Sequence, residues 1–407
     1  MLMLKNLDYE MAKRNLQGVV VYGDTTLGNP DLAYLAGGNL ARGGIYIKRL
    51  GHEPLLLTSG LDIATARRLG RVKRIQTYSE WKLEDLSAKY GRDNAYPHLI
   101  TTILKSEGIH GDVTVSGRND LSSGVHLVDE LRRLGTQVVG ETSPTVLEST
   151  RETKNQTEIA EIRRVGRKTA EIVESVSKTL RNMKRKRGHL CLGKERATVS
   201  EVKKLISSKL AQQDLTAPEG TIFAIGSSSA DPHNAGIPTN PIKEGKPIVF
   251  DIFPQADTGY WFDLTRSFVV GKADAKAKRL FEAVSEAQND SLDMLREGVT
   301  GEAAMLEACR VIERHGYRTV REIFEGKSKS IDSGFTHSLG HGVGLTIGER
   351  PYLSFLSKDP LKHGQVVTVE PGIYLPKYGG IRIEDTVLIT PKGVDNLAST
   401  DKELELT

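Results

Sequence analysis

The sequence predicts an α/β domain followed by a larger mixed α+β domain that contains an internal duplication. The chain of 407 residues is long enough for two or three domains. Near residue 150 its pattern changes from short β-type runs between helical stretches to longer helices and paired β-type runs. Two of these paired runs, which begin at residues 244 and 363, resemble each other. We therefore expect domains over residues 1–150 and 151–407.

The composition is that of a soluble globular protein, with 38% hydrophobic and 27% charged residues. The formal net charge is only +4, and acidic and basic residues are interspersed, which argues against a nucleic-acid partner. The two cysteines, Cys191 and Cys309, provide neither a disulfide framework nor a paired-cysteine metal site. Since no apolar run is long enough to span a bilayer, we expect a cytoplasmic protein without a membrane partner.

The first domain is expected to be α/β because β-type runs alternate with helical stretches. The β-type runs are GVVVYG, GIYIKR, PLLLTS, DVTVSG and QVVGET, and SSGVHLVDELRRLG is a representative helical stretch. The polar segment STRETKNQ, residues 149–156, is expected to join the two domains.

The second domain is expected to begin with a long helix from Glu158 to Arg181. Asn155 is suited to cap it, and Glu158 follows three residues later, as in a capping box. Further helices are expected over residues 275–296 and 302–314. The basic run KRKR, Lys184–Arg187, is expected to be a solvated helix end rather than a nucleic-acid contact, and GSSSADPHNAG, residues 226–236, a loop that carries His233.

The duplication places four carboxylates at matching positions. In EGKPIVFD and HGQVVTVE, Asp251 and Glu370 each come six residues after a turn glycine, at the end of a β-type run. In GYWFDLTRSFVV and GGIRIEDTVLIT, Asp263 and Glu384 each precede a threonine by two residues inside the next strand pattern. Two similar hairpins related by approximate two-fold symmetry would bring these four side chains together.

Four buried carboxylates would repel one another and raise each other's pKa unless cations compensate their charge. Carboxylate oxygens together with an imidazole suit Mn, Co, Zn or Fe(II), and bridging carboxylates can hold two such ions. The segment FTHSLGHGVGL offers the imidazoles of His337 and His341 between the two hairpins. The glycines on either side of His341 are expected to let the backbone approach a metal. The residues therefore predict a site for two divalent metal ions.

The segments GYWFDLTRSF, ADPH, HSLGHGVGL, VEPGIY and GIRIED resemble the signature of the pita-bread metallopeptidases, namely Xaa-Pro dipeptidases, Xaa-Pro aminopeptidases and methionine aminopeptidases. The five segments occur in consistent order within residues 155–407. The region before residue 150 resembles the smaller creatinase- or prolidase-like N-terminal domain, which points away from methionine aminopeptidase. The resemblance implies a pita-bread catalytic domain with pseudo-two-fold symmetry over residues 151–407 and hydrolysis of the Xaa-Pro bond of short peptides by a metal-activated water. It also implies a homodimer.

Carried over residue by residue, the resemblance implies the metal ligands. Asp251 would chelate one ion, His341 and Glu370 would bind the other, and Asp263 and Glu384 would bridge the two.

The resemblance also implies catalytic roles for residues beside the metals. Glu370 would move a proton from the attacking water to the leaving nitrogen. His233 and His337 would lie near the substrate and could donate to the oxyanion or orient the scissile carbonyl. Arg382, two residues before Glu384 and therefore expected on the same face of its strand, would hold a liganding carboxylate in place.

Two departures from the family pattern bear on these expectations. Asp251 and Asp263 are 12 residues apart, one more than is usual, so PQAD is expected to form a longer turn or a bulge. In GHGVGLTIGERP, Gly348 stands seven residues after His341, where the family usually has a further histidine. Three alternatives therefore remain: a noncatalytic homologue that binds peptides or proteins, a peptidase with non-proline specificity, and a metal-free hydrolase of the creatinase type. The complete set of five ligands favours a metallopeptidase, with the choice between dipeptidase and aminopeptidase open.

Overall fold

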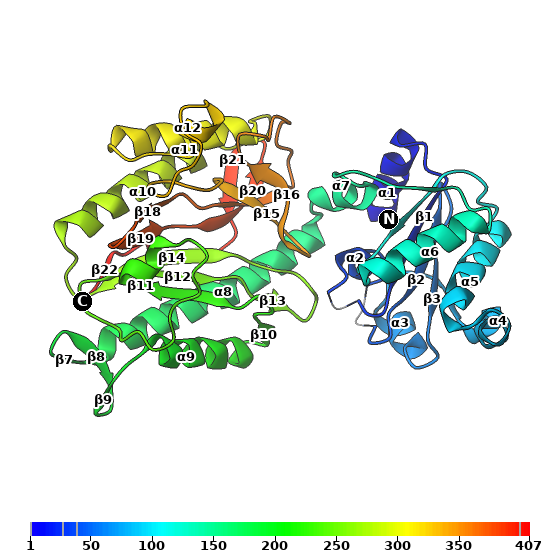
Figure 1. The fold of residues 1–407 in the computed structure, drawn as a ribbon, viewed down its shortest axis with the longest axis horizontal. Helices are drawn as coiled ribbons and strands as arrows, with labels where there is room; N and C mark the ends of the chain where they lie inside the picture. The colour runs from blue at the N-terminus through cyan, green and yellow to red at the C-terminus, as the bar shows by residue number, and fades with distance from the viewer. Residues whose placement is uncertain (1, 27, 38–39, 399) are drawn as a thin grey trace. The chain divides into compact units, whose positions relative to one another are not determined.

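The computed structural model of the chain describes residues 2–26, 28–37, 40–398 and 400–407, which cluster into two units, Met1–Arg151 and Glu152–Thr407 (Figure 1). None of the described helices has the length and apolar character needed to cross a membrane.

The first unit is built on a six-stranded sheet among its described residues, with the strand order β4-β3-β2-β1-β5-β6. Only β2 runs antiparallel to its neighbours, while β1 pairs with β5, β5 with β6 and β3 with β4 in parallel. The five expected β-type runs are confirmed as strands. The polar strand β4 escaped the sequence analysis because it is an edge strand without a buried residue. The strands are β1 (Gly18–Gly23), β2 (Gly44–Arg49), β3 (Leu55–Thr58), β4 (Arg74–Thr77), β5 (Val113–Ser116) and β6 (Val138–Val139).

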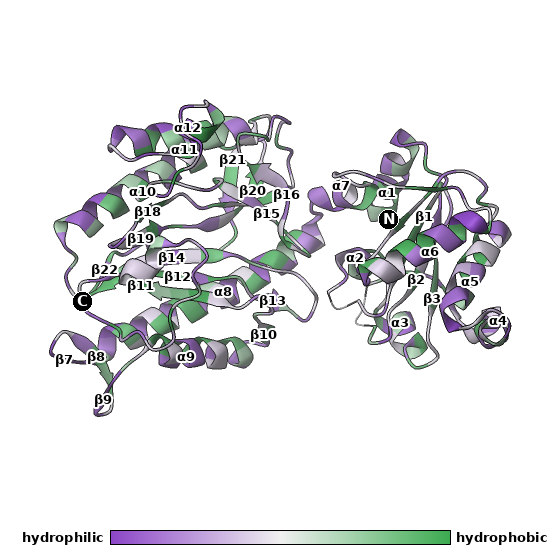
Figure 2. Cartoon of the chain, viewed as in Figure 1, coloured by the Kyte–Doolittle hydropathy of each residue, from purple (hydrophilic) through white to green (hydrophobic). Residues whose placement is uncertain are grey.

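The helices of the first unit pack apolar stripes against this sheet. On α6, Leu127 and Leu131 are four residues apart and both buried, and they join a core with the inner strands. Figure 2 shows the inner strands mostly green and α6 striped in green and purple. The helices are α1 (Leu2–Lys13), α2 (Pro30–Ala36), α3 (Ile63–Leu69), η1 (Ser79–Trp81), α4 (Leu83–Tyr90), α5 (Arg92–Ser106) and α6 (Leu121–Arg133), followed by α7 (Val146–Glu152), which makes much of the expected polar joint helical.

The second unit begins with the long helix α8 (Gln156–Asn182), as expected. The Asn155 side chain accepts from the backbone of Glu158, and the Glu158 side chain accepts from the backbone of Asn155, so the capping box is confirmed. The expectation that the basic run ends a helix was wrong. The helix ends at Asn182, and Lys184–Lys186 form an exposed strand, β7, that pairs with β8 (His189–Leu192) around a turn with left-handed Arg187 and Gly188.

Two sheets form the middle of the second unit, and helix pairs cover their outer faces. The sheet β11-β12-β14-β22 packs against α8 and α9, and the sheet β16-β15-β17-β20-β21 packs against α10 and α11 (Figure 1). This arrangement is the pseudo-two-fold one expected from the duplication. The other elements are β9 (Glu195–Arg196), α9 (Val199–Gln212), β10 (Leu215–Thr216), β11 (Thr221–Ile225), η2 (Gly226–Ala230), β12 (Pro247–Ile252), β13 (Gln255–Ala256), β14 (Leu264–Val270), α10 (Ala275–Met294), α11 (Gly301–Arg314), α12 (Arg321–Phe324), β15 (Gly340–Val343), β16 (Ile347–Leu353), β17 (Val366–Val369), β18 (Gly372–Leu375), β19 (Gly379–Arg382), β20 (Asp385–Thr390), β21 (Gly393–Asn396) and β22 (Glu405–Leu406).

The two duplicated hairpins carry the four carboxylates at strand ends. Strand β12 pairs antiparallel with β14, and β17 pairs antiparallel with β20. Asp251 lies in β12 and Glu370 directly follows β17. Asp263 and Glu384 directly precede β14 and β20 instead of lying inside them, which corrects the sequence expectation by one residue. At this boundary the ladder stops, so each side chain is free to face the space between the sheets.

The additional residue between Asp251 and Asp263 is accommodated by an extended turn, as expected. Gln255 forms a bridge with Trp261, and Ala256 and Tyr260 are joined by a backbone hydrogen bond of 2.9 Å. The turn therefore closes above the ladder, and β12 and β14 still pair in a continuous register.

A buried ion pair ties the two hairpins together. Arg266 Nη2 donates to Asp385 Oδ1 over 2.8 Å, and Arg266 Nη1 donates to the backbone oxygen of Glu384 over 2.6 Å. Burial alone would raise the pKa of Asp385, but Arg266 and Lys402 hold it below its usual range. The pair fixes β14 against the start of β20, where Glu384 is positioned.

Helix α8 carries Gly166 where a side chain would collide with Phe262, which lies just before β14. A Cβ atom at Gly166 would lie 2.5 Å from Cε2 of the fully buried Phe262. Gly166→Ala is therefore expected to destabilise the fold by about 1–3 kcal/mol, although alanine is the better helix former. Because Phe262 precedes Asp263, the displacement would also reach the site.

Urea unfolding measures the effect of Gly166→Ala. The control is Gly124→Ala in α6, where a Cβ would meet nothing within 4 Å; it is expected to stabilise by about 0.5–1 kcal/mol. Equal stabilisation by both substitutions would contradict the packing argument.

Candidate metal centre

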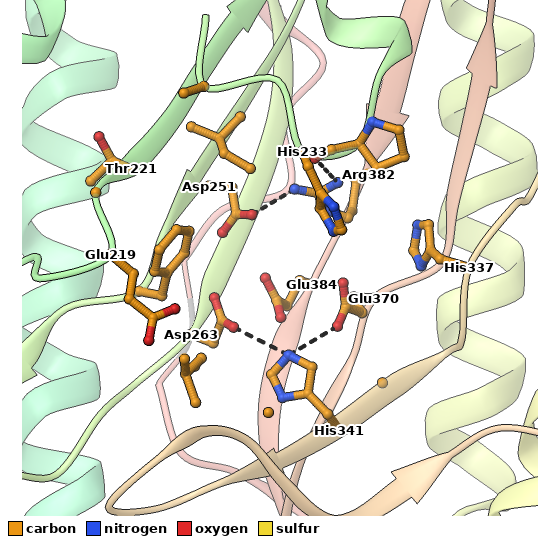
Figure 3. A pocket seen from close by; sticks show the side chains of 18 of the residues that line it. Glu219, Thr221, His233, Asp251, Asp263, His337, His341, Glu370, Arg382 and Glu384 are labelled. Atoms are coloured by element: carbon orange, nitrogen blue, oxygen red, sulfur yellow. Dashed lines mark hydrogen bonds and ion pairs between the residues drawn. The ribbon is translucent and has the colours of Figure 1, made fainter. Parts of the chain in front are cut away.

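All the expected site residues line one cavity of about 600 Å³ in the second unit. Figure 3 shows the labelled side chains converging from the two hairpins, from β15 and from the loops that carry His233 and His337. The expected ligands are Asp251, Asp263, His341, Glu370 and Glu384, and the other expected site residues are His233, His337, Gly348 and Arg382. The structure therefore brings together residues that are spread over more than 150 positions of the chain.

The spacing of the ligand atoms suits a metal ion. His341 Nε2 lies 3.4 Å from Glu370 Oε1 and 3.6 Å from Asp263 Oδ2. One ligand atom each from Asp263, His341 and Glu384 lie within 4.8 Å of one another. Ligands about 2.1 Å from a tetrahedral ion are about 3.4 Å apart, so these atoms can share one cation with little rearrangement.

Three buried carboxylate oxygens at this site lack a hydrogen-bond partner among the described residues: Asp251 Oδ1, Asp263 Oδ1 and Glu384 Oε1. A buried carboxylate oxygen without a compensating donor or cation is costly. Hard or borderline divalent cations take oxygen and imidazole nitrogen ligands, and this donor set provides them. The residues therefore fit divalent metal ions.

The pKa values of three carboxyl groups in the site are raised, because their charges are buried close together. Burial, together with the charges of Glu384, Asp251 and Glu370, raises the pKa of Asp263 well above its usual range. Burial and the charges of Glu370 and Asp251 do the same for Glu384. Burial raises the pKa of Glu370 to about 7, with the Asp251 charge adding to the rise. The carboxylates therefore raise one another's pKa, as the sequence predicted.

His341 is oriented by its own strand. Its Nδ1 lies 3.1 Å from the backbone oxygen of Gly342, which can only accept, so Nδ1 carries the proton and Nε2 offers its lone pair to the site. The flanking glycines have a different role from the one expected. A Cβ at Gly340 would lie 2.0 Å from the oxygen of Thr368, and one at Gly342 would lie 2.3 Å from the oxygen of Arg350. They allow the neighbouring strands, rather than a metal, to approach the backbone.

Arg382 binds one of the expected ligands, Asp251, directly. Its Nη2 donates to Asp251 Oδ2 over 2.5 Å, and its Nη1 donates to Tyr374 Oη over 2.7 Å and to the backbone oxygen of Pro232 over 3.2 Å. Arg382 does not share a strand with Glu384, contrary to the sequence expectation. It ends β19, and the chain leaves that strand before Glu384. Arg382 therefore joins Asp251 to the loop of His233.

Three polar residues to which the sequence assigned no role contact the expected site residues. Thr265 Oγ1 donates to Glu384 Oε2 over 2.7 Å, and Thr368 Oγ1 donates to Glu370 Oε1 over 3.1 Å. Tyr374 accepts from Arg382. A signal for Thr265 was present, because a threonine follows both Asp263 and Glu384 by two residues. The second of these threonines, Thr386, in turn donates to the backbone oxygen of Asp263 over 2.8 Å, so each hairpin supports the other.

His337 belongs to a hydrogen-bonded chain that starts at Arg382. Burial and the nearby Arg382 charge lower the pKa of His337 to about 3, so its ring is neutral at physiological pH. Its Nδ1 lies 2.7 Å from the Ser338 oxygen and must donate to it, which leaves Nε2 to accept from Tyr374 Oη at 2.9 Å. In this state Nε2 carries no proton, so His337 can donate to a substrate only after Nε2 has been protonated.

His233 lies in the expected loop, is exposed, and faces the same cavity. Its backbone nitrogen donates to Asp231 Oδ1 over 3.1 Å. The Arg382 contact with Pro232 fixes this loop one residue away from His233. Figure 3 shows the two imidazoles, His233 and His337, on one side of the carboxylate cluster.

Gly348 lies in β16 and has a left-handed backbone with φ of +75°. A Cβ there would meet nothing within 4 Å, so the cavity has room for a side chain. The left-handed conformation nevertheless disfavours any residue other than glycine. A histidine at position 348 would therefore require a different backbone conformation.

The model of metallopeptidase family M24 matches residues 160–391. The Xaa-Pro dipeptidase of Pyrococcus furiosus is 40% identical over 184 residues, which are 45% of this chain and 48% of that protein. The putative dipeptidase YkvY of Bacillus subtilis is 34% identical over 185 residues, 45% of this chain and 46% of that protein. The chain thus spans about half the length of the curated relatives that it matches.

Solved structures agree over nearly the full chain. The prolidase from Pyrococcus furiosus superposes with a TM-score of 0.73 at 26% identity and covers 97% of this chain and 99% of its own. The Xaa-Pro dipeptidase from Bacillus anthracis has a TM-score of 0.77 at 23% identity, with 99% and 98% covered, and supports the fold. The expected pita-bread fold is confirmed. Since the family model spans more than half of its residues, the chain belongs to metallopeptidase family M24.

Proposed function

We propose that the chain hydrolyses the bond before proline in short peptides, as an Xaa-Pro dipeptidase or Xaa-Pro aminopeptidase with two divalent metal ions. The observation that carries this proposal is the convergence of five ligating side chains with three partnerless buried carboxylate oxygens among the described residues. The names of the Pyrococcus furiosus and Pyrococcus horikoshii relatives, both Xaa-Pro dipeptidases, support the reaction class.

The ligand assignment follows the resemblance and suits the geometry. Asp251 would bind one ion, His341 and Glu370 the other, and Asp263 and Glu384 both. Bound divalent ions such as Mn, Co, Zn or Fe(II) would polarise the substrate carbonyl and lower the pKa of a water. The protein would orient the ligands before metal binds through three hydrogen bonds. These run from Arg382 to Asp251, from Thr265 to Glu384 and from Thr368 to Glu370.

Glu370 is the proposed proton carrier. It would accept a proton from the attacking water and deliver it to the proline nitrogen as the peptide bond breaks. Its oxygens lie beside His341 and Thr368, and its backbone nitrogen donates to the Leu339 oxygen over 2.8 Å, so the carboxyl group is held at the metal ligands.

The imidazoles would bind the substrate beside the ligands. His233 is the better placed donor to the substrate carbonyl, because its ring is exposed to the cavity while both nitrogens of His337 are already hydrogen-bonded. His337 would act with Tyr374, which connects it to Arg382.

Two features of this proposal concern the rest of the molecule. We assign residues 1–150 to the creatinase- or prolidase-like domain of the same family and residues 151–407 to the catalytic domain. The homodimer and the cytoplasmic location stay predictions; sedimentation of the purified protein tests the first, and cell fractionation tests the second.

A peptidase of non-proline specificity is the second candidate, because Gly348 leaves a wall of the cavity without the family's histidine. A noncatalytic binding protein or a metal-free hydrolase is less well supported. Neither of these functions needs partnerless buried carboxylates at Asp251, Asp263 and Glu384, which cost stability unless cations bind.

The test is hydrolysis by metal-stripped protein to which Mn, Co or Zn is returned. The substrates are an Xaa-Pro dipeptide, an Xaa-Pro-Yaa tripeptide and a peptide that begins with Met. Metal-restored cleavage before proline supports the proposal, and the preferred length decides between dipeptidase and aminopeptidase. Cleavage restricted to bonds without proline supports the second candidate, and no cleavage despite bound metal overturns both.

A further inference from the structure

Among the described residues that line the cavity, Glu219 is the one carboxylate that is not an expected metal ligand. Glu219 is exposed and lines the cavity together with the metal ligands. It lies in a tight turn before β11, closed by a hydrogen bond of 3.0 Å from the Gly220 nitrogen to the Ala217 oxygen. Figure 3 shows its carboxylate directed into the cavity on the side of Asp263.

Glu219 has no ion-pair partner in the described parts of the chain. The two described Lys and Arg side chains that line the cavity are engaged elsewhere. Lys203 Nζ donates to the backbone oxygens of Thr221 and Ala235 over 2.8 and 2.9 Å, and Arg382 binds Asp251. The cavity wall therefore presents a negative charge that the protein itself leaves uncompensated.

The wall between Glu219 and the ligands is apolar. Ile222 and Phe253 both line the cavity, and Phe253 packs against the apolar cluster to which Ile222 belongs. Ile222 lies directly opposite Asp251 in the β11–β12 ladder. Glu219 is three residues before Ile222, so their Cα atoms are no more than about 10 Å apart. A substrate side chain that reaches from the metal ligands to Glu219 must follow this apolar surface.

The position of the imidazoles indicates which part of a peptide would lie there. His233 and His337 lie on the opposite side of the carboxylate cluster from Glu219 (Figure 3). The imidazoles occupy that side of the cavity, so the side towards Phe253 and Glu219 is open to the side chain of the residue whose carbonyl His233 would bind. The residue before the scissile bond would then extend towards Phe253 and Glu219.

We propose that Glu219 selects peptides whose residue before the scissile bond is lysine or arginine. This inference rests on the proposed peptidase function. Lysine and arginine have an aliphatic stem that can lie on Ile222 and Phe253 and a cationic end that can reach the carboxylate. The peptide's α-ammonium group is the other possible cation. It has no stem, is attached to the reacting residue itself, and so would remain beside the metal ligands rather than at the end of an apolar wall.

The experiment compares metal-loaded wild type, Glu219→Gln and Glu219→Lys on Lys-Pro and norleucine-Pro. Norleucine has a lysine-like stem without the charge. The readout is the ratio of the two kcat/KM values, which cancels differences in metal content between preparations. Wild type is expected to favour Lys-Pro, and Glu219→Gln is expected to reduce the ratio about fivefold, the upper range for a partly exposed ion pair. Glu-Pro is included as a third substrate, and Glu219→Lys should cleave Glu-Pro with a higher kcat/KM than Lys-Pro. Glu195→Gln, on the exposed strand β9, is the matched control with an unchanged ratio.

The outcomes separate this inference from the function on which it rests. A reduced ratio in Glu219→Gln together with the reversed preference of Glu219→Lys supports it. An unchanged ratio in both variants overturns it while the peptidase function stands. Equal losses on Lys-Pro and norleucine-Pro assign Glu219 to the α-ammonium group and overturn side-chain selection. No hydrolysis of either peptide by the metal-loaded wild type overturns the peptidase function itself.

Discussion

Asp263→Asn is expected to lower hydrolysis of an Xaa-Pro dipeptide by more than about a hundredfold and to reduce the number of metal ions bound. Asparagine is nearly isosteric but lacks the charge needed to bridge two cations. Substitution of a residue that only supports a metal ligand already costs about 10–100-fold, so loss of a ligand should cost more. Enzyme kinetics at saturating Mn and metal analysis after gel filtration measure the two effects. Glu384→Gln is expected to behave in the same way.

A second readout for Asp263→Asn excludes misfolding as the cause. The metal-free variant is expected to be more stable than the metal-free wild type at pH 8, because one of the mutually repelling buried carboxylates is gone. Asp293→Asn, an exposed position on α10, is the matched control that should change neither activity nor stability. Neutralising Lys184 on the basic strand β7 should likewise leave hydrolysis intact. Full activity of Asp263→Asn would contradict the proposal that Asp263 is a bridging ligand.

Metal removal is expected to produce a protein whose stability falls as the pH rises. Glu370 has a pKa near 4.5 when unfolded and about 7 in the folded, metal-free protein. The folded state therefore binds more protons than the unfolded state between these values, and stability is lost as pH rises through this window. The shift corresponds to about 3 kcal/mol for Glu370 alone, at about 1.4 kcal/mol per pKa unit. Asp263 and Glu384 act in the same direction.

Urea unfolding at pH 5 and pH 8, with and without bound metal, measures this dependence. The metal-loaded protein should show a much smaller change, because cations compensate the carboxylates, and metal binding near pH 6 should release protons. Glu370→Gln should weaken the pH dependence of the metal-free protein. Equal stability of the metal-free wild type at both pH values would show that burial does not raise the pKa of these carboxyl groups.

The local pattern of the chain was sufficient to predict most elements that position the site. Strand β12 was recognisable because it is an apolar run, and Asp251 was conspicuous within it because carboxylates avoid buried strands. The capping box at Asn155 and Glu158 lies within four consecutive residues, so helix α8 was predicted from its own sequence. The exposed strand β7 was mistaken for a helix end because its pairing partner, rather than its own composition, defines it.

The sequence by itself predicted the two-part α/β organisation, the duplicated hairpins and the five expected ligands, because each of them was recognisable from short local motifs. Only the tertiary structure decided what surrounds those ligands. Thr265 and Glu384 are 119 residues apart, and Arg382 and Asp251 are 131 apart, so no local pattern could pair them. Glu219 likewise had no motif to identify it. Its place in the cavity follows from the packing of β11 against β12, which local periodicity does not specify.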